Sequence, residues 1–96
     1  MYGLVGQLRT TVDGRPEVVA ALVEGARDMP GNLAYLVAED AEDAGAVWVT
    51  EVWESEAAHR ASLELPSVRD AIARARPHLV GMGVRAVTRP VASLGA

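Results

Sequence analysis

The sequence predicts an α+β fold of the ferredoxin-like order β-α-β-β-α-β, with one four-stranded antiparallel sheet and two helices on one of its faces. Strand-type segments occur at residues 2–11, 33–39, 46–53 and 82–91. Apolar residues with helical spacing lie between the first and second strands and again between the third and fourth. Glycine, proline and acidic residues mark the turns between these segments.

The first strand, at residues 2–11, is ended by the turn signal Asp13-Gly14. Pro16 suits the first position of the helix that follows, because a backbone N–H would have no partner there. The helix ends at Met29-Pro30-Gly31. We expect its buried face to follow the spacing i, i+3, i+4, i+7 and to contain Val19, Leu22, Val23 and Ala26.

The second and third strands form an antiparallel hairpin, and the acidic segment at residues 39–45 joins them. The carboxylates of this segment are neighbours in the sequence and lack the spacing of a calcium-binding loop. We therefore expect a solvated turn here and not a metal site.

The second helical region begins at Ser55, whose side chain can cap the first turn, and Glu56 puts a carboxylate near the positive end of the helix. Pro66 interrupts this helix and begins a renewed one, which Pro77 ends. The fourth strand, at residues 82–91, follows. The renewed helix carries the apolar residues Val68, Ala71, Ile72 and Ala75.

The third strand is apolar on both of its faces. Val47, Val49 and Trp53 lie on one face, and Trp48 and Val52 lie on the other. Two helices of the chain can cover only one face of the sheet. Because large apolar surfaces are rare on monomers, we expect a homodimer in which two sheets pack face to face.

Length and charge narrow the class of protein. The chain has 96 residues, and we expect one domain over residues 1–96. A net charge of -4 with scattered arginines provides no basic surface for nucleic acid. No apolar run approaches the roughly 18 residues of a membrane span, and no leader segment is recognisable. We therefore expect a soluble, cytoplasmic protein without a nucleic-acid or membrane partner.

The residue types that are missing exclude several chemistries. Without cysteine there are no disulfides, thiolate nucleophiles or thiolate metal sites. Without lysine there is no Schiff-base catalysis and no P-loop. The two histidines, His59 and His78, are far apart, and no glycine-rich dinucleotide motif occurs. We therefore expect no metal, flavin or nicotinamide cofactor.

A pocket is predicted where the third strand runs into the second helical region. Trp53 ends the strand, and His59 follows about one helical turn after Ser55, so both can face the same cavity. The alternatives are a core position for Trp53 and a surface or packed position for His59. Glu51 interrupts an apolar strand, and it is either a pocket carboxylate, a member of a structural ion pair or a residue at the edge of the sheet. Tyr35 is either a pocket residue or a core or interface aromatic.

Nearly the whole chain resembles the antibiotic biosynthesis monooxygenase family of the dimeric α/β-barrel superfamily. The resemblance is carried by Met29-Pro30-Gly31 before Leu33-Ala34-Tyr35, by Glu39-Asp40, by Glu51-Val52-Trp53-Glu54-Ser55-Glu56-Ala57, and by Leu65-Pro66. It implies a dimeric α/β barrel. It also implies a cofactor-independent monooxygenase that oxidises a quinol, an anthrone or another phenolic small molecule with O2.

The resemblance also suggests roles for single residues. Trp53 matches a tryptophan that ends the third strand in the family, and Arg69 matches an arginine of the second helix. His59 stands where the anthrone oxygenases carry a tyrosine. The sequence departs from those enzymes at Val49, where they have an asparagine, and at Ala38, where they have a histidine.

The resulting hypothesis assigns catalysis to His59 as the base, Arg69 as the group that stabilises a phenolate, and Trp53 as a stacking surface. A free histidine side chain has a pKa of about 6.5, which suits a general base near neutral pH. Tyr35, Glu51 and Val49 are the expected substrate-binding residues. Two alternatives stay open: a non-catalytic dimeric protein that binds a small ligand or acts as an auxiliary protein, and an isomerase or lyase that uses Glu51 inside the pocket.

Overall fold

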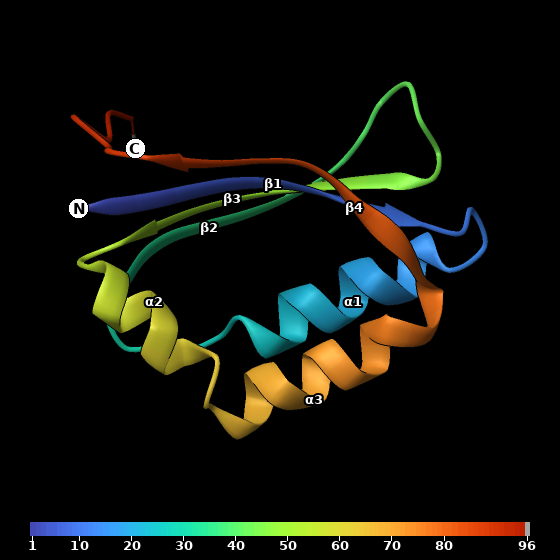
Figure 1. Cartoon of the computed structure of the whole chain (residues 1–96), viewed down its shortest axis with the longest axis horizontal. Helices are drawn as coiled ribbons and strands as arrows, with labels where there is room; N and C mark the ends of the chain where they lie inside the picture. The colour runs from blue at the N-terminus through green and yellow to red at the C-terminus, as the bar shows by residue number, and fades with distance from the viewer. Residues whose placement is uncertain (96) are drawn as a thin grey trace.

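The computed structural model describes residues 1–95 of the chain. Its strands lie in one layer, and its helices form a second layer against one face of the sheet (Figure 1). This arrangement confirms the predicted α+β ferredoxin-like fold. The elements are β1 (Tyr2–Thr10), α1 (Arg15–Gly25), β2 (Asn32–Glu39), β3 (Ala46–Trp53), α2 (Glu56–Ser62), α3 (Pro66–Ala75), the short 3-10 turn η1 (Arg76–His78) and β4 (Leu79–Thr88).

The sheet has the strand order β2-β3-β1-β4, and all of its pairings are antiparallel. The register decides which residues meet across the strands on the face that the helices cover. One row on this face contains Tyr35, Glu51, Leu4 and Val87, and the next contains Val37, Val49, Gly6 and Arg85.

The opposite face of the sheet has no helix over it among residues 1–95 (Figure 1). We call it the helix-free face. Its apolar side chains stand in water, and Leu36 and Val84 are each 62% exposed. Two of its rows are Leu36, Thr50, Val5 and Ala86, and Ala34, Val52, Gly3 and Thr88.

Local interactions explain how the chain passes from β3 into α2. The Ser55 hydroxyl accepts a hydrogen bond from the backbone N–H of Ala58 at 3.1 Å, which confirms the predicted N-cap. Gly31 has a φ of 79°, and a Cβ atom there would come within 2.7 Å of the Ala58 Cβ. Glycine is therefore required at this turn, which lies directly against the beginning of α2.

The buried face of α1 differs from the predicted one. Val18, Ala21 and Gly25 are buried, whereas Val23 is 45% exposed. The reason is that α1 packs closely along α3. The two helices are so close at Gly25 that a side chain there would collide with Ala71. The buried face of α1 is therefore rotated about the helix axis, away from the face that would be buried if α1 packed only against the sheet.

The fourth strand begins three residues earlier than predicted. Thr11 N–H donates to the His78 carbonyl at 3.0 Å, and Leu79 then pairs directly with Thr10. The strand ends at Thr88, shortly before Pro90, which has no N–H for the sheet. The expected range of residues 82–91 was therefore wrong at both ends.

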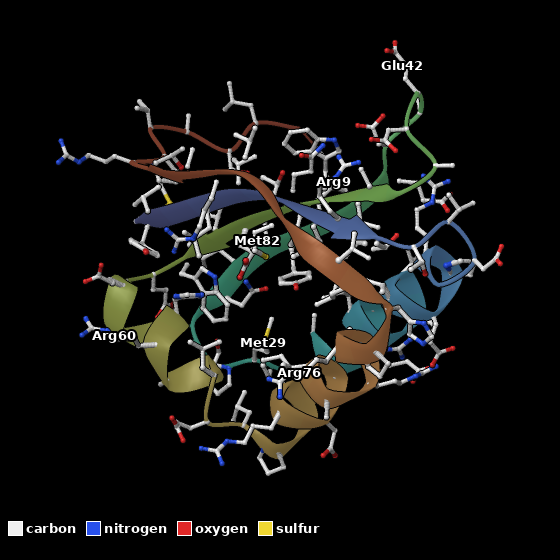
Figure 2. All side chains as sticks on the ribbon, turned by 45° about the vertical axis from the view of Figure 1, so that its right-hand side comes forward. Arg9, Met29, Glu42, Arg60, Arg76 and Met82 are labelled. Carbon is white, nitrogen blue, oxygen red and sulfur yellow. The ribbon has the colours of Figure 1, made fainter. Side chains whose placement is uncertain are left out.

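The acidic turn between β2 and β3 is held together by its own carboxylates. Asp40 accepts a hydrogen bond from the Trp48 indole N–H at 2.8 Å, and this bond, with backbone N–H donors, lowers the pKa of Asp40. The Gly45 backbone N–H and Arg9 lower the pKa of Asp43 in the same way. Glu42 points outward from the tip of the turn (Figure 2). The carboxylates of Asp40 and Asp43 therefore stabilise the turn through hydrogen bonds.

Candidate active site

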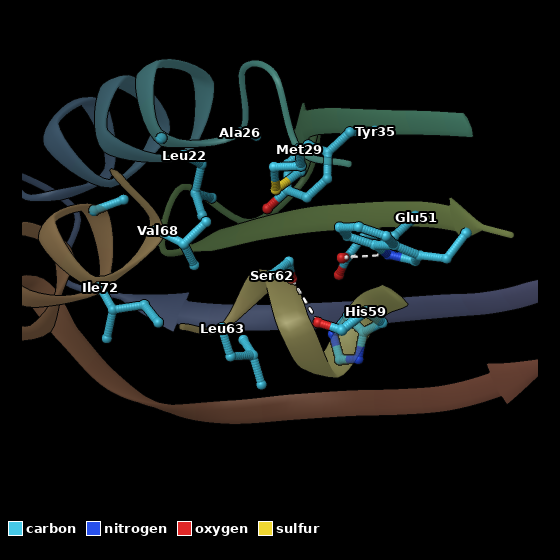
Figure 3. A pocket seen from close by; sticks show the side chains of 13 residues that line it. Leu22, Ala26, Met29, Tyr35, Glu51, His59, Ser62, Leu63, Val68 and Ile72 are labelled. Carbon is cyan, nitrogen blue, oxygen red and sulfur yellow. Dashed lines mark hydrogen bonds between the residues drawn. The ribbon is translucent and has the colours of Figure 1, made fainter. Parts of the chain in front are cut away.

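A cavity of about 400 Å³ lies between the covered face of the sheet and the helices. We call it the main cavity. An inner recess of about 130 Å³ shares part of its wall and reaches toward Met29 and Trp53 (Figure 3). Both spaces are lined by Leu22, Tyr35, Glu51, His59, Leu63, Ala71 and Ile72. The walls are mainly apolar, so the few polar groups can orient a ligand.

Glu51 brings a carboxyl group into this apolar space. It lies in the middle of β3, where Tyr35 of β2 and Leu4 of β1 are its cross-strand neighbours. Burial raises the pKa of Glu51, while the Trp53 hydrogen bond and the charges of His59 and Arg85 oppose that shift. The carboxyl group is thus inside the cavity and holds its proton to a higher pH than an exposed glutamate does.

Trp53 forms the end wall of the recess. Its side chain is fully buried, and its indole N–H donates to Glu51 Oε1 at 3.1 Å (Figure 3). The predicted position of Trp53 at the end of the third strand is correct. The tryptophan is therefore a core residue and a pocket residue together, so the two interpretations of its role do not exclude each other.

His59 projects from α2 and lines both the main cavity and the recess. Its ring lies edge-on to Trp53, with centroids 5.5 Å apart and planes at 67°. On its other side the Tyr2 ring is 5.7 Å away. Because the cap at Ser55 sets where α2 begins, it also decides which helical residue faces the cavity.

Tyr35 stands beside Glu51 on the neighbouring strand and also lines both spaces. Burial strongly raises the pKa of Tyr35, and the nearby Glu51 carboxylate raises it further. The phenol is therefore neutral at physiological pH. It can donate a hydrogen bond to a ligand, but it cannot act as a base there.

The two remaining expected residues have different positions. Val49 is buried and lines the main cavity. Arg69 does not line either space: it lies on the outer face of α3 and forms an ion pair with Glu64. Its neighbours Val68 and Ala71 take the inner face of the helix, so the side chain of Arg69 must point outward. This corrects the expected position of Arg69.

Sequence reasoning missed the arginine that does line the main cavity, which is Arg85 of β4. The alternation of β4 separates Arg85 from Val84 and Ala86, but nothing local shows which set faces the helices. Met29, which is buried beside the recess, and Met82, which lines the main cavity but is 62% exposed, were also missed. Gly6 is a further lining residue without a sequence assignment.

Two properties of the described part of the chain bear on metals and membranes. Within residues 1–95, no three side chains of the types His, Asp or Glu are grouped so that they could hold a metal ion. No helix in the same range has the length and apolarity needed to cross a membrane.

The sequence profile of the family described as antibiotic biosynthesis monooxygenase matches residues 1–74. The comparison with curated proteins gives no match.

Several solved structures are similar. A candidate antibiotic biosynthesis monooxygenase from Chloroflexus aurantiacus has 50% sequence identity and a TM-score of 0.94, with 98% of this chain and 96% of that chain covered. One from Deinococcus radiodurans has 22% identity and a TM-score of 0.76, with 100% and 98% covered. One from Caulobacter crescentus has 21% identity and a TM-score of 0.84, with 95% and 90% covered. The last two comparisons concern the fold alone.

Proposed function

Because this chain belongs to the antibiotic biosynthesis monooxygenase family, we propose that it oxidises a quinol, an anthrone or another phenolic molecule with O2, without a metal or organic cofactor. The observation that carries the proposal is the grouping of Glu51 and Tyr35 from the sheet with His59 from α2 around one apolar cavity of about 400 Å³. Such a cavity suits a flat aromatic molecule with a hydroxyl group at one edge.

The first step is removal of the substrate's phenolic proton by His59. The imidazole faces the cavity, and the fully buried Trp53 ring packs edge-on against it and holds it in place. Tyr35 is neutral and can donate a hydrogen bond to the substrate oxygen. Deprotonation makes the ring electron-rich enough to react with O2.

Arg85 takes the role that the sequence suggested for Arg69. Its guanidinium is the permanent positive charge in the lining of the main cavity, whereas Arg69 is paired with Glu64 outside it. A cation near the bound phenolate stabilises the negative charge that forms when His59 takes the proton. Val49 contributes an apolar contact from the floor of the cavity.

The electron balance of the reaction requires no further reductant. The phenolate donates one electron to O2, and the resulting substrate radical and superoxide combine to form a carbon–oxygen bond. The peroxide anion takes the proton that His59 removed and becomes a hydroperoxide, which returns His59 to its neutral form. When the carbon also carries hydrogen, the hydroperoxide breaks at its O–O bond, water leaves and a carbonyl group remains. One oxygen atom enters the product, the other becomes water, and the substrate supplies all the electrons.

The proposed enzyme is a homodimer that closes a barrel through the helix-free faces of two sheets. This face carries several apolar side chains, among them Leu36, which is 62% exposed in the single chain. A two-fold arrangement pairs the same surface with itself, so one apolar face covers the other. Neither substrate cavity is blocked, because each lies on the opposite side of its sheet.

Oxygen uptake by the purified protein tests the proposal. With a panel of hydroquinones and anthrones, we expect uptake that survives a chelator and occurs without flavin absorbance. His59→Ala should lower kcat by about 10²–10⁴-fold, the loss typical of a general base. His59→Tyr should retain more activity than His59→Ala. Equal activity of all three proteins would remove the role of His59, and loss of activity with a chelator would remove the cofactor-free mechanism.

A second candidate function is supported by the position of Glu51. A carboxyl group with a raised pKa inside an apolar cavity is suited to proton transfer, as an isomerase or lyase requires. Turnover of a substrate under strictly anaerobic conditions, abolished by Glu51→Gln, would favour this alternative. Binding of phenols without any turnover, in air or without it, would favour a non-catalytic binding protein.

A further inference from the structure

Gly6 lies in the middle of β1, on the face of the sheet that the helices cover. Its cross-strand neighbours are Val49 on one side and Arg85 on the other. A glycine inside a strand weakens the sheet, because it has no side chain to pack and loses more backbone freedom than other residues. Its presence in a central strand therefore needs a reason.

Other glycines of the chain have a packing reason that Gly6 lacks. A Cβ atom at Gly3, on the same strand but the opposite face, would collide with Thr88 Oγ1 and touch Pro90 Cγ at 3.0 Å. A Cβ atom at Gly6 would have no atom within 4 Å. Gly6 is also absent from the glycines with positive φ, so its backbone suits any residue. Neither its neighbours nor its conformation requires glycine.

The empty space above Gly6 is the main cavity. Leu4 and Leu8 flank Gly6 on the same face of β1, and all three residues line the cavity. Their larger side chains form walls, while at Gly6 the bare backbone lies open between them. A flat ring can rest there at van der Waals distance, which is the close ligand approach that glycine allows in a strand.

We propose that Gly6 is the floor of the substrate site and, because it has no side chain, determines how large an aromatic ring system the cavity accepts. The inference rests on the proposed function only in treating the main cavity as the substrate site. When a substrate ring lies over Gly6, the hydroxyl group of the substrate points along the sheet toward Glu51. Glu51 is in the neighbouring row of cross-strand pairs, opposite Leu4. A side chain at Gly6 occupies the place of the second or third fused ring.

Binding of three probes of increasing size tests this inference. Calorimetric titrations with phenol, 2-naphthol and anthrone would compare the wild type with Gly6→Ala and Gly6→Val, and thermal unfolding would accompany each variant. We expect Tm to stay equal or rise, because nothing obstructs the new side chain and the unfolded chain loses freedom. Gly6→Ala should raise the Kd for 2-naphthol and for anthrone by about 10-fold or more, which is the effect of one carbon atom that does not fit. Phenol should be affected much less.

A compensating variant separates volume from other effects. Val49 stands directly opposite Gly6 on the same face, so Val49→Ala returns space beside the added methyl group. The double variant Gly6→Ala/Val49→Ala should therefore bind 2-naphthol more tightly than Gly6→Ala alone. A double variant that binds no better than Gly6→Ala would contradict the steric argument.

Three results would overturn the inference: equal affinities of wild type and Gly6→Val for the two larger probes, a clear fall in Tm that reveals a structural need for glycine, or no binding of any probe by the wild type. The proposed oxidation fails separately. If the wild type binds 2-naphthol in the Gly6-dependent way but consumes no oxygen with any phenol, the size limit stands and the monooxygenase function does not.

Discussion

Replacing Trp53 by phenylalanine should destabilise the protein by an amount that depends on pH. The indole N–H donates to Glu51 Oε1 at 3.1 Å, and phenylalanine keeps a ring in the fully buried site but removes this donor. A hydrogen bond to a charged group contributes about 1.5–3 kcal/mol, and one between neutral groups about 0.5–1.5 kcal/mol. The lost contribution is therefore larger when Glu51 is ionised.

The sign follows from the pKa of Glu51. Burial raises this pKa above the ordinary value of 4.5, and the Trp53 hydrogen bond works against the rise. A group whose pKa is higher in the folded protein than in the unfolded chain stabilises the fold fully at pH values below its unfolded-state pKa. This stabilisation is lost as the pH rises through the folded-state pKa. Without the Trp53 donor the folded pKa rises further. Trp53→Phe should thus lose about 1 kcal/mol more stability at about pH 8 than at about pH 4.

Urea unfolding at both pH values measures this difference, and a double-mutant cycle isolates it. Glutamine at position 51 keeps an oxygen that can accept the indole N–H but does not ionise. In the Glu51→Gln background, the cost of Trp53→Phe should therefore be the same at both pH values. The reasoning would be refuted if the stability lost through Trp53→Phe were independent of pH in the wild-type background. It would also be refuted if this loss still depended on pH in the Glu51→Gln background.

Three further predictions concern the interface, the cavity charge and the buried carboxyl. Leu36→Glu, on the helix-free face, should shift the proposed homodimer to monomers in light scattering, whereas Arg60→Glu on the exposed side of α2 should not. Arg85→Ala should raise the Kd for 2-naphthol more at a pH where the ligand is ionised, while Arg69→Ala should leave Kd unchanged at every pH. Glu51→Gln should raise the free energy of unfolding at about pH 8 and bring no gain at about pH 4, because burial raises the pKa of this carboxyl group.

Local chemistry explains why most of the elements could be predicted. The bounds of β3, residues 46–53, and the cap at Ser55 were correct, because β-branched and aromatic residues, a capping hydroxyl and prolines act within a few residues of the chain. These two features also placed Trp53 and His59 at one end of the sheet. The positions of these two site residues could therefore be predicted from the sequence.

Contacts between distant elements decided the rest. The buried side of α1 was turned by its close packing on α3, where Gly25 meets Ala71. The start of β4 depended on the bond between Thr11 and His78, which are far apart in the chain. No periodicity within a single segment records either contact.

The sequence by itself determined the α+β class and the order of the strands and helices, and it predicted that Trp53 and His59 lie near each other. Only the tertiary structure decided that Arg85 and not Arg69 faces that cavity, and that Gly6 leaves its floor open. For the two strand residues, the physical reason is the register of β1 with β3 and β4, since a shift of one residue would turn Arg85 and the open side of Gly6 to the opposite face. Arg69 lies on the outer side of α3, where it pairs with Glu64.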